Sequence, residues 1–233
     1  MTTLNENEIR RYYDNVYHKD VSIMRGSSLH FSRLAKRLGP WEGKQLLDVG
    51  CGGGQWLMAA AQLGANPVGI DISQVAIDAC RQMLPDTELH CSSAETLPFK
   101  DKRFDVISCL GSLEHFLDPR SALREMVRVA KPAAKILLCV PNANFLTRRV
   151  GLYCGTQQAE IREEVLTLAA WEDLFNSAGL SVTRRWRDLH VLSWSWIGQG
   201  KWYLMPIRAA QALALPLWPI SWQYQVYYLC QIK

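Results

Sequence analysis

Short apolar runs alternate with longer amphipathic segments along most of this sequence. The runs have the length and the aliphatic or β-branched content of strands, whereas the segments between them repeat apolar positions at helical spacing. The predicted strands cover residues 45–50, 66–71, 87–91, 104–109, 135–140, 180–187 and 223–232. This alternation is typical of an α/β fold, so we predict a Rossmann-like, doubly wound, seven-stranded and mostly parallel sheet.

Capping residues mark several of the helices between these strands. Ser73 is placed to cap a helix over 74–83, and Asp118 followed by Pro119 is a typical helix start. Further helices are predicted over 54–63, 119–130 and 168–178, and two helical segments within 5–38 precede the sheet.

The chain is expected to form one domain. Its 233 residues, of which 48% are hydrophobic and 21% charged, suffice for one buried core. In order, the predicted parts are an N-terminal helical lid (1–40), a core of alternating strands and helices (41–187), an aromatic and basic insertion (188–222) and a closing strand (223–232).

Cysteine usage and the N-terminal segment favour a cytoplasmic protein. The seven cysteines are scattered and mostly lie inside apolar runs. No pair has the C-x-x-C spacing of metal or redox sites, so we interpret them as buried free thiols in a reducing compartment. The first residues are polar and charged, unlike a secretory signal.

The C-terminal part of the sequence is basic and rich in tryptophan. Between Leu174 and Lys233 a single acid, Asp188, stands against six basic residues, and five of the nine tryptophans lie in or beside the 188–222 insertion. One interpretation of this composition is peripheral contact with the inner surface of a membrane, whereas Arg208 and several prolines argue against a transmembrane span. The alternatives are a cap over a ligand site, a dimer interface, a nucleic-acid contact and a solvated basic face.

The strongest chemical signal is the run LDVGCGGG between the first strand and the helix after it. Gly50, Gly52 and Gly54 allow a sharp turn and a close approach of the backbone to a ligand, beside the free N–H groups of a helix start. Asp71 ends the second strand, at about the twenty-residue spacing from which an acid reaches ribose hydroxyls. Together these features predict a nucleotide site.

The spacing of the glycines separates two kinds of nucleotide. A dinucleotide fold needs G-x-G-x-x-G, but this loop has G-x-G-x-G and carries Asp48 two residues before its first glycine. A carboxylate in that place is unfavourable beside a pyrophosphate and favourable beside a cationic amino-acid group. The residues therefore favour S-adenosylmethionine over NAD.

Five ordered segments resemble the class I S-adenosylmethionine-dependent methyltransferases that act on small molecules, the type 11 or ubiquinone-pathway-like group. They are LLDVGCGGGQW, GIDIS, SSAETLPF, FDVISCLGSLEHFLDP and the proline loop before ILLCVPN, spread over about residues 40–185. The resemblance implies that S-adenosylmethionine binds here and leaves as S-adenosylhomocysteine. The residues that it assigns to the cofactor are Asp48, Gly50, Cys51, Gly52, Gly54, Asp71, Ile72, Ser93, Ala94, Glu95 and Leu110.

Two positions depart from that family pattern. Ser93 stands where the family usually has an acid that accepts a hydrogen bond from the adenine amino group, so a weaker hydroxyl acceptor is implied. Gly111 stands where the ubiquinone-pathway enzymes have an acid that helps to bind magnesium, so no metal is expected.

Candidate catalytic residues follow the fourth strand, at the edge of the sheet where ligands bind in such folds. Methyl transfer to an oxygen needs a proton acceptor, for which histidine is suited near neutral pH. The pair Glu114-His115 resembles that of ubiquinone-pathway and sugar methyltransferases, which implies a catalytic role with His115 as the base. The alternative is a structural pair that caps the following turn. Further candidates for the base are His190, Tyr12 and Tyr13.

These features predict a methyltransferase for a small or lipid-linked acceptor, with an oxygen of a sugar, quinone precursor or polyprenyl-linked glycan as the methylated atom. The loop after the fourth strand lacks the N-P-P-Y type of signature that base-modifying enzymes use, so no nucleic-acid partner is expected. The alternative from another class is a non-catalytic module that keeps the fold for binding at a membrane or a partner protein.

Overall fold

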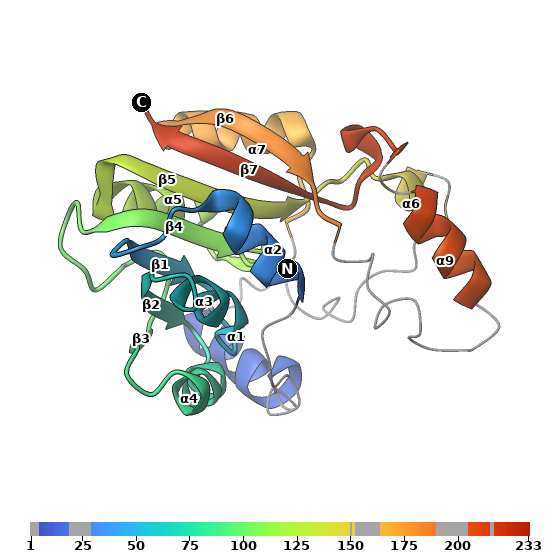
Figure 1. The fold of residues 1–233 in the computed structure, drawn as a ribbon. Helices are drawn as coiled ribbons and strands as arrows, with labels where there is room; N and C mark the ends of the chain where they lie inside the picture. Colours follow the sequence, from blue (N-terminus) through green and yellow to red (C-terminus); the bar gives the residue numbers. More distant parts are fainter. Residues whose placement is uncertain (1–4, 19–28, 150, 152–163, 190–204, 215–216) are drawn as a thin grey trace.

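Seven strands form one sheet in the order β3-β2-β1-β4-β5-β7-β6 (Figure 1). Only the pairs that involve β7 are antiparallel, those with β5 and β6. The computed structural model describes residues 5–18, 29–149, 151, 164–189, 205–214 and 217–233. The predicted Rossmann-like, mostly parallel sheet is therefore confirmed. Its strands are β1 (Gln45–Val49), β2 (Asn66–Asp71), β3 (Glu88–Cys91), β4 (Phe104–Leu110), β5 (Ala130–Pro141), β6 (Leu180–Arg187) and β7 (Gln225–Ile232).

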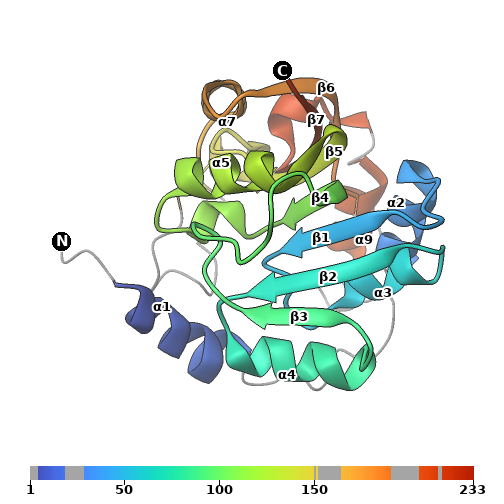
Figure 2. The ribbon, with the colours of Figure 1, turned by 90° about the vertical axis from the view of Figure 1, so that its left-hand side faces the viewer.

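Helices cover both faces of this sheet, with α5 and α7 on one face and α2 and α3 on the other (Figure 2). The α-helices are α1 (Glu6–Tyr12), α2 (Leu29–Leu38), α3 (Gln55–Ala61), α4 (Gln74–Met83), α5 (Pro119–Val129), α6 (Leu146–Arg149), α7 (Leu168–Ser177) and α9 (Met205–Ala214). Shorter or wider turns are the π-helical η1 (Tyr13–Tyr17) and the 3-10 turns η3 (Leu113–His115) and η6 (Ile220–Trp222).

The two layers of helices bury two separate parts of the core. On one face, Leu123 and Met126 of α5 pack with Trp171 and Phe175 of α7. On the other, Leu34 of α2 and Trp56 of α3 belong to a second cluster. Strands β1, β4 and β5 contribute to both clusters, which explains why their sequences are nearly continuous apolar runs and not alternating ones.

The helix caps read from the sequence are present. The Ser73 hydroxyl accepts a hydrogen bond from the Ala76 amide at 3.2 Å, and Asp118 accepts one from the Ser121 amide at 3.1 Å. Both interactions satisfy amides that the first turn of a helix leaves unpaired. They fix the starts of α4 and α5, and hence the loops that follow β2 and precede α5.

Strand β5 is longer than its apolar run predicted. It begins at Ala130, directly after α5, and Ala130 pairs with Phe104 before a register shift brings Lys135 opposite Val106. The residues between them include exposed positions, so hydrophobicity alone placed the start of the strand at Lys135. Strand β7, by contrast, begins two residues later than predicted, at Gln225.

The 188–222 insertion contains a helix, α9, that the sequence reading did not place. Pro206 is one of the prolines that argue against a transmembrane span, and it lies in the first turn of α9, where a missing amide costs nothing. Helix α9 lies beyond the carboxyl ends of β5 and β6 (Figure 1). Trp194, Trp196 and Trp202 fall outside the described residues. In the described part of the chain, no helix has both the length and the apolar character needed to cross a bilayer.

Candidate functional site

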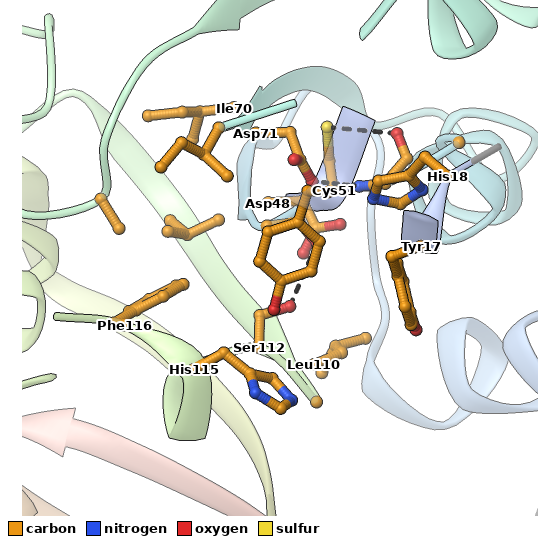
Figure 3. Close-up of a pocket in the computed structure, with 18 of the residues that line it drawn as sticks. Tyr17, His18, Asp48, Cys51, Ile70, Asp71, Leu110, Ser112, His115 and Phe116 are labelled. Carbon is orange, nitrogen blue, oxygen red and sulfur yellow. Dashed lines mark hydrogen bonds between the residues drawn. The ribbon is translucent and has the colours of Figure 1, made fainter. Parts of the chain in front are cut away.

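A cavity of about 350 Å³ opens at the carboxyl ends of β1, β2 and β4 (Figure 3). Its size is typical of small-molecule sites, and its position at this edge of the sheet is where α/β folds bind ligands. Every residue that the sequence assigned to the cofactor lines it: Asp48, Gly50, Cys51, Gly52, Gly54, Asp71, Ile72, Ser93, Ala94, Glu95 and Leu110. Of the catalytic candidates, His115 and Tyr13 line it as well, whereas Glu114 and Tyr12 do not.

The glycine loop turns sharply between β1 and α3. Gly50, Gly52 and Gly54 all have a positive φ, of 78°, 50° and 81°. A Cβ on Gly50 would lie 2.5 Å from the Ser112 hydroxyl oxygen, and one on Gly54 would lie 2.3 Å from the Cys80 sulfur. The backbone conformation favours glycine at all three positions, and at Gly50 and Gly54 the lack of space does so as well.

Asp48 is a buried carboxylate at the floor of the cavity. Its Oδ1 accepts a hydrogen bond from Ser108 Oγ at 2.6 Å, and Ser108 Oγ in turn accepts one from Trp56 Nε1 at 2.8 Å. Burial outweighs the hydrogen bond and raises the pKa of Asp48 to about 7. A cationic ligand group beside it would favour the carboxylate form, so this site is suited to positive charge.

Asp71 is held rigidly at the end of β2. Its two oxygens accept hydrogen bonds from the amides of Gly52, at 2.8 Å, and Ser73, at 2.9 Å. Burial raises the pKa of Asp71, and the two amides act in the opposite direction. The side chain thereby joins the glycine loop to the start of α4 and faces the cavity (Figure 3).

At the far end of the cavity, Ser93 is not the free acceptor that the sequence implied. Its hydroxyl donates to the Glu95 carboxylate and also accepts a hydrogen bond from the Glu95 amide at 3.2 Å. The other Glu95 oxygen accepts one from the Asp118 amide at 3.2 Å. The acidic group at this edge is therefore Glu95, two residues beyond the position where the family usually has its acid.

His115 and Glu114 share the 3-10 turn η3 after β4, but they face different surroundings. The His115 ring lines the cavity, and its centroid lies 6.5 Å from that of Tyr13 in an edge-on arrangement. Glu114 is buried behind it, with Oε1 at 3.9 Å from His115 Nε2. The histidine of this pair therefore lies against the cavity, and the carboxylate lies on the buried side of the ring. Among the described residues, no three His, Cys, Asp or Glu side chains are arranged to hold a metal ion.

The N-terminal segment forms one wall of the cavity. Ile9, Tyr13, Tyr17 and His18 line it, and Asp14 accepts hydrogen bonds from the Ser73 hydroxyl at 2.7 Å and the Val75 amide at 3.3 Å. The segment is thereby tied to the start of α4. His190, a further candidate for the base, lies outside the described residues.

Several lining residues were not named from the sequence, among them Tyr17, His18, Ser112 and Phe116. The available signal was the spacing of four between Ile9, Tyr13 and Tyr17, because residues four apart share a helix face. All three line the cavity, whereas Tyr12 does not.

The core of the chain is similar to known proteins. Residues 47–138 match a family model described as a methyltransferase domain. The ubiquinone biosynthesis O-methyltransferase of Alkalilimnicola ehrlichii is 36% identical over 121 residues, which cover 50% of this chain and 49% of that protein. The chain thus spans about half the length of the curated relatives that it matches.

Solved structures share the fold over nearly the whole chain. A chain from the complex of the Haloferax volcanii Trm112 methyltransferase activator with a methyltransferase has a TM-score of 0.73 and 19% identity, with 96% of this chain and 97% of that one covered. The [4+2]-cyclase SpnF has a TM-score of 0.71 and 17% identity, with 100% of this chain and 98% of that one covered. Magnesium protoporphyrin IX methyltransferase from Synechocystis PCC 6803, solved with bound S-adenosylmethionine, has a TM-score of 0.65 and 13% identity, with 100% of both chains covered.

The chain has the Rossmann-like fold of solved S-adenosylmethionine-dependent methyltransferases. Its segment 47–138 matches the methyltransferase-domain family model. The glycine loop, Asp71 and the loop that ends at His115 all lie within that segment.

The raised pKa of Asp48 predicts a pH-dependent effect of Asp48→Asn on the ligand-free protein. The folded protein favours the protonated Asp48 carboxyl. The stability that this preference contributes is complete below the pKa of Asp48 in the unfolded chain and is lost as the pH rises through the folded-state pKa of about 7. Asp48→Asn removes this loss. The free energy of unfolding of the Asp48→Asn variant, relative to that of wild type, should rise between pH 5 and pH 8 by up to about 1.4 kcal/mol per pH unit.

Urea unfolding at several pH values measures this difference. The exposed Asp78→Asn is the matched control and should show no such trend, because Asp78 pairs only with neighbours on the surface of α4. A pH-independent difference between Asp48→Asn and wild type would contradict the prediction.

Proposed function

We propose that the protein transfers a methyl group from S-adenosylmethionine to an oxygen of a small or lipid-linked acceptor. The acceptor classes in view are sugars, quinone precursors and polyprenyl-linked glycans. The observation that carries the proposal is that the glycine loop, Asp71 and a histidine, His115, line the same cavity. The match of residues 47–138 to a methyltransferase domain supports the same reaction.

The residues of the cavity fit the cofactor's distribution of charge. The amino-acid end of S-adenosylmethionine carries an ammonium and a sulfonium, and the buried Asp48 carboxyl is suited to such positive charge. Asp71, held by two backbone amides, is placed to accept hydrogen bonds from ribose hydroxyls. When bound, the cofactor supplies an electrophilic methyl group on sulfur; the chain's own task is to hold the acceptor oxygen in line with it.

His115 is the proposed base for the acceptor hydroxyl. Removal of the proton makes the oxygen a better nucleophile, and Glu114, 3.9 Å behind the ring, stabilises the imidazolium that results. Tyr13 packs beside His115, and burial is the main cause that raises the pKa of its phenol, so it stays protonated and can donate a hydrogen bond.

The cavity next to His115 favours an acceptor with an apolar part. Phe116 and Leu117 follow His115 in the lining, and Phe31 lines the cavity from α2. This environment suits an aromatic ring or an isoprenoid chain. The name of the relatives, ubiquinone biosynthesis O-methyltransferase, supports a quinone precursor as the first acceptor class to test.

Membrane contact through the 188–222 insertion would bring a lipid-linked acceptor to the site. In the described part of the insertion, Met205, Leu213, Leu217 and Trp222 are exposed, with Leu213 at 79% and Leu217 at 85%. The sequence beyond Asp188 has basic residues and no acid. Exposed apolar side chains without negative charge are typical of segments that contact anionic lipid surfaces.

The alternative is a non-catalytic module that keeps the fold for binding at a membrane or a partner protein. Both functions allow cofactor binding, so binding alone does not separate them. Methyl transfer does, because a module without catalysis would release no S-adenosylhomocysteine in the presence of any acceptor.

Cofactor binding is tested by calorimetric titration with S-adenosylmethionine and S-adenosylhomocysteine. Saturable binding is expected for wild type, and Asp71→Asn, which halves the acceptor capacity of the side chain, should weaken both ligands at least about tenfold. The circular dichroism melting curve of the variant shows whether the fold is retained. Absence of binding by folded wild-type protein would overturn the proposal.

The role of His115 is tested by turnover with radiolabelled S-adenosylmethionine and 3,4-dihydroxybenzoate as a catechol probe. His115→Gln should lower kcat by about a hundredfold, the usual contribution of a general base, with little change in the Kd of S-adenosylmethionine. The surface variant His90→Gln should retain wild-type turnover. Equal kcat values for His115→Gln and wild type would exclude His115 as the base.

Membrane contact is tested by sedimentation with phosphatidylcholine vesicles, with and without phosphatidylglycerol. Leu213→Ser combined with Leu217→Ser should weaken binding by at least about tenfold, because each buried leucine contributes about 1.5 kcal/mol. Leu29→Ser is the control, since Leu29 is 75% exposed but belongs to α2. Vesicle binding that is equal for the double variant and wild type would assign the insertion another role.

A further inference from the structure

His18 is a buried basic side chain in the cofactor cavity, and the proposed reaction gives it no role. Only 7% of the residue is exposed, and it directly follows the π-helical turn η1. Its Nδ1 is buried and has no hydrogen-bond partner among the described residues. The ring lies in the cavity beside the glycine loop (Figure 3). A buried polar atom of this kind is costly unless something binds it.

The charges that line the cavity are unbalanced. Asp48, Asp71 and Glu95 line it with carboxyl groups, whereas the described lining residues include no lysine and no arginine. His18 and His115 are the lining side chains that can become cationic. The methionine part of the cofactor, however, carries an α-carboxylate besides its two positive groups. That carboxylate needs a donor, because an unpaired buried anion is strongly unfavourable.

The position of His18 fits the carboxylate better than that of His115. An ideal Cβ on Gly52 would lie 3.8 Å from His18 Cε1, so the ring lies directly over the glycine loop. This loop is expected to surround the methionine part of the cofactor. His115 instead lies at the other side of the cavity, in the turn after β4 with Glu114 behind it (Figure 3).

The surroundings of His18 support a ligand-dependent charge on its ring. Asp71 at the end of β2 and Asp14 of η1 favour the imidazolium, and the rings of Tyr13 and Tyr17 pack against it. Burial acts against them and is the larger effect, so the pKa of His18 is lowered in the empty cavity. An anionic ligand group at the ring would shift this balance toward the charged donor.

We propose that His18 binds the α-carboxylate of S-adenosylmethionine and S-adenosylhomocysteine and so makes the cavity selective for nucleosides that keep the amino-acid group. This inference rests on the proposed function, because it presupposes that the cavity binds this cofactor. It also gives η1 a role in ligand recognition, since Asp14 anchors the same turn to Ser73.

The test compares two ligands that differ only in this carboxylate. S-adenosylhomocysteine and its decarboxylated counterpart are titrated calorimetrically into wild type and His18→Gln, which keeps the polarity and approximate size but cannot carry the charge. His18→Gln should weaken S-adenosylhomocysteine by about tenfold to a hundredfold, the range of a charge-assisted hydrogen bond. The decarboxylated ligand should change by less than about threefold. His18→Lys, which restores a cation, should recover part of the selectivity.

The outcomes separate this inference from the proposed function. If wild type binds neither ligand, the cofactor assignment fails. If wild type binds S-adenosylhomocysteine but His18→Gln weakens both ligands equally, the ring only packs against the cofactor and the carboxylate assignment is overturned. His90→Gln, a histidine on β3 that pairs with Glu88 outside the cavity, serves as the control and should leave both affinities unchanged.

Discussion

The cavity depends on how the chain leaves β1. The amides of Gly50 and Cys51 both donate to the Ile70 carbonyl, at 2.8 and 2.9 Å, so the glycine loop is pinned to the end of the neighbouring strand. A turn this tight requires positive φ values that only glycine adopts without strain. Ser112 and Cys80 then pack where a Cβ would otherwise lie. The loop after β4, the start of α3 and the face of α4 are all positioned by this one backbone path.

Much of this arrangement could be predicted because its causes are local. Buried strands are apolar runs, Ser73 and Asp118 carry their cap signals in their own side chains, and the glycine loop is recognisable within eight residues. The N-terminal segment was harder to place, because what ties it to the cavity wall is a contact with a distant element, from Asp14 to Ser73. Helix α9 was not predicted, although its Pro206 lies in a first turn, where proline is tolerated.

The roles within the site depend on contacts between distant parts of the chain, which no local pattern reports. Asp14 reaches Ser73 across 59 positions, and Ser108 reaches Asp48 across 60. Likewise, the family pattern indicates only which position usually holds an acid. It could not predict that the Ser93 hydroxyl donates a hydrogen bond to Glu95. Sequence therefore located the cavity, and the structure was needed to show which groups in it are already paired.

Pairing is what distinguishes the three carboxyl groups of the cavity. Each oxygen of Asp71 accepts one hydrogen bond from a backbone amide, which fixes the side chain in place, and Glu95 is held by Ser93 and the Asp118 amide. Asp48 has a single hydroxyl donor and is the most deeply buried, which raises its pKa to about 7. The fold alone serves unrelated reactions. A buried acid with a pKa near 7 and a buried histidine in the same cavity say more about the ligand. A ligand that has both a cationic and an anionic group can pair with both side chains at once.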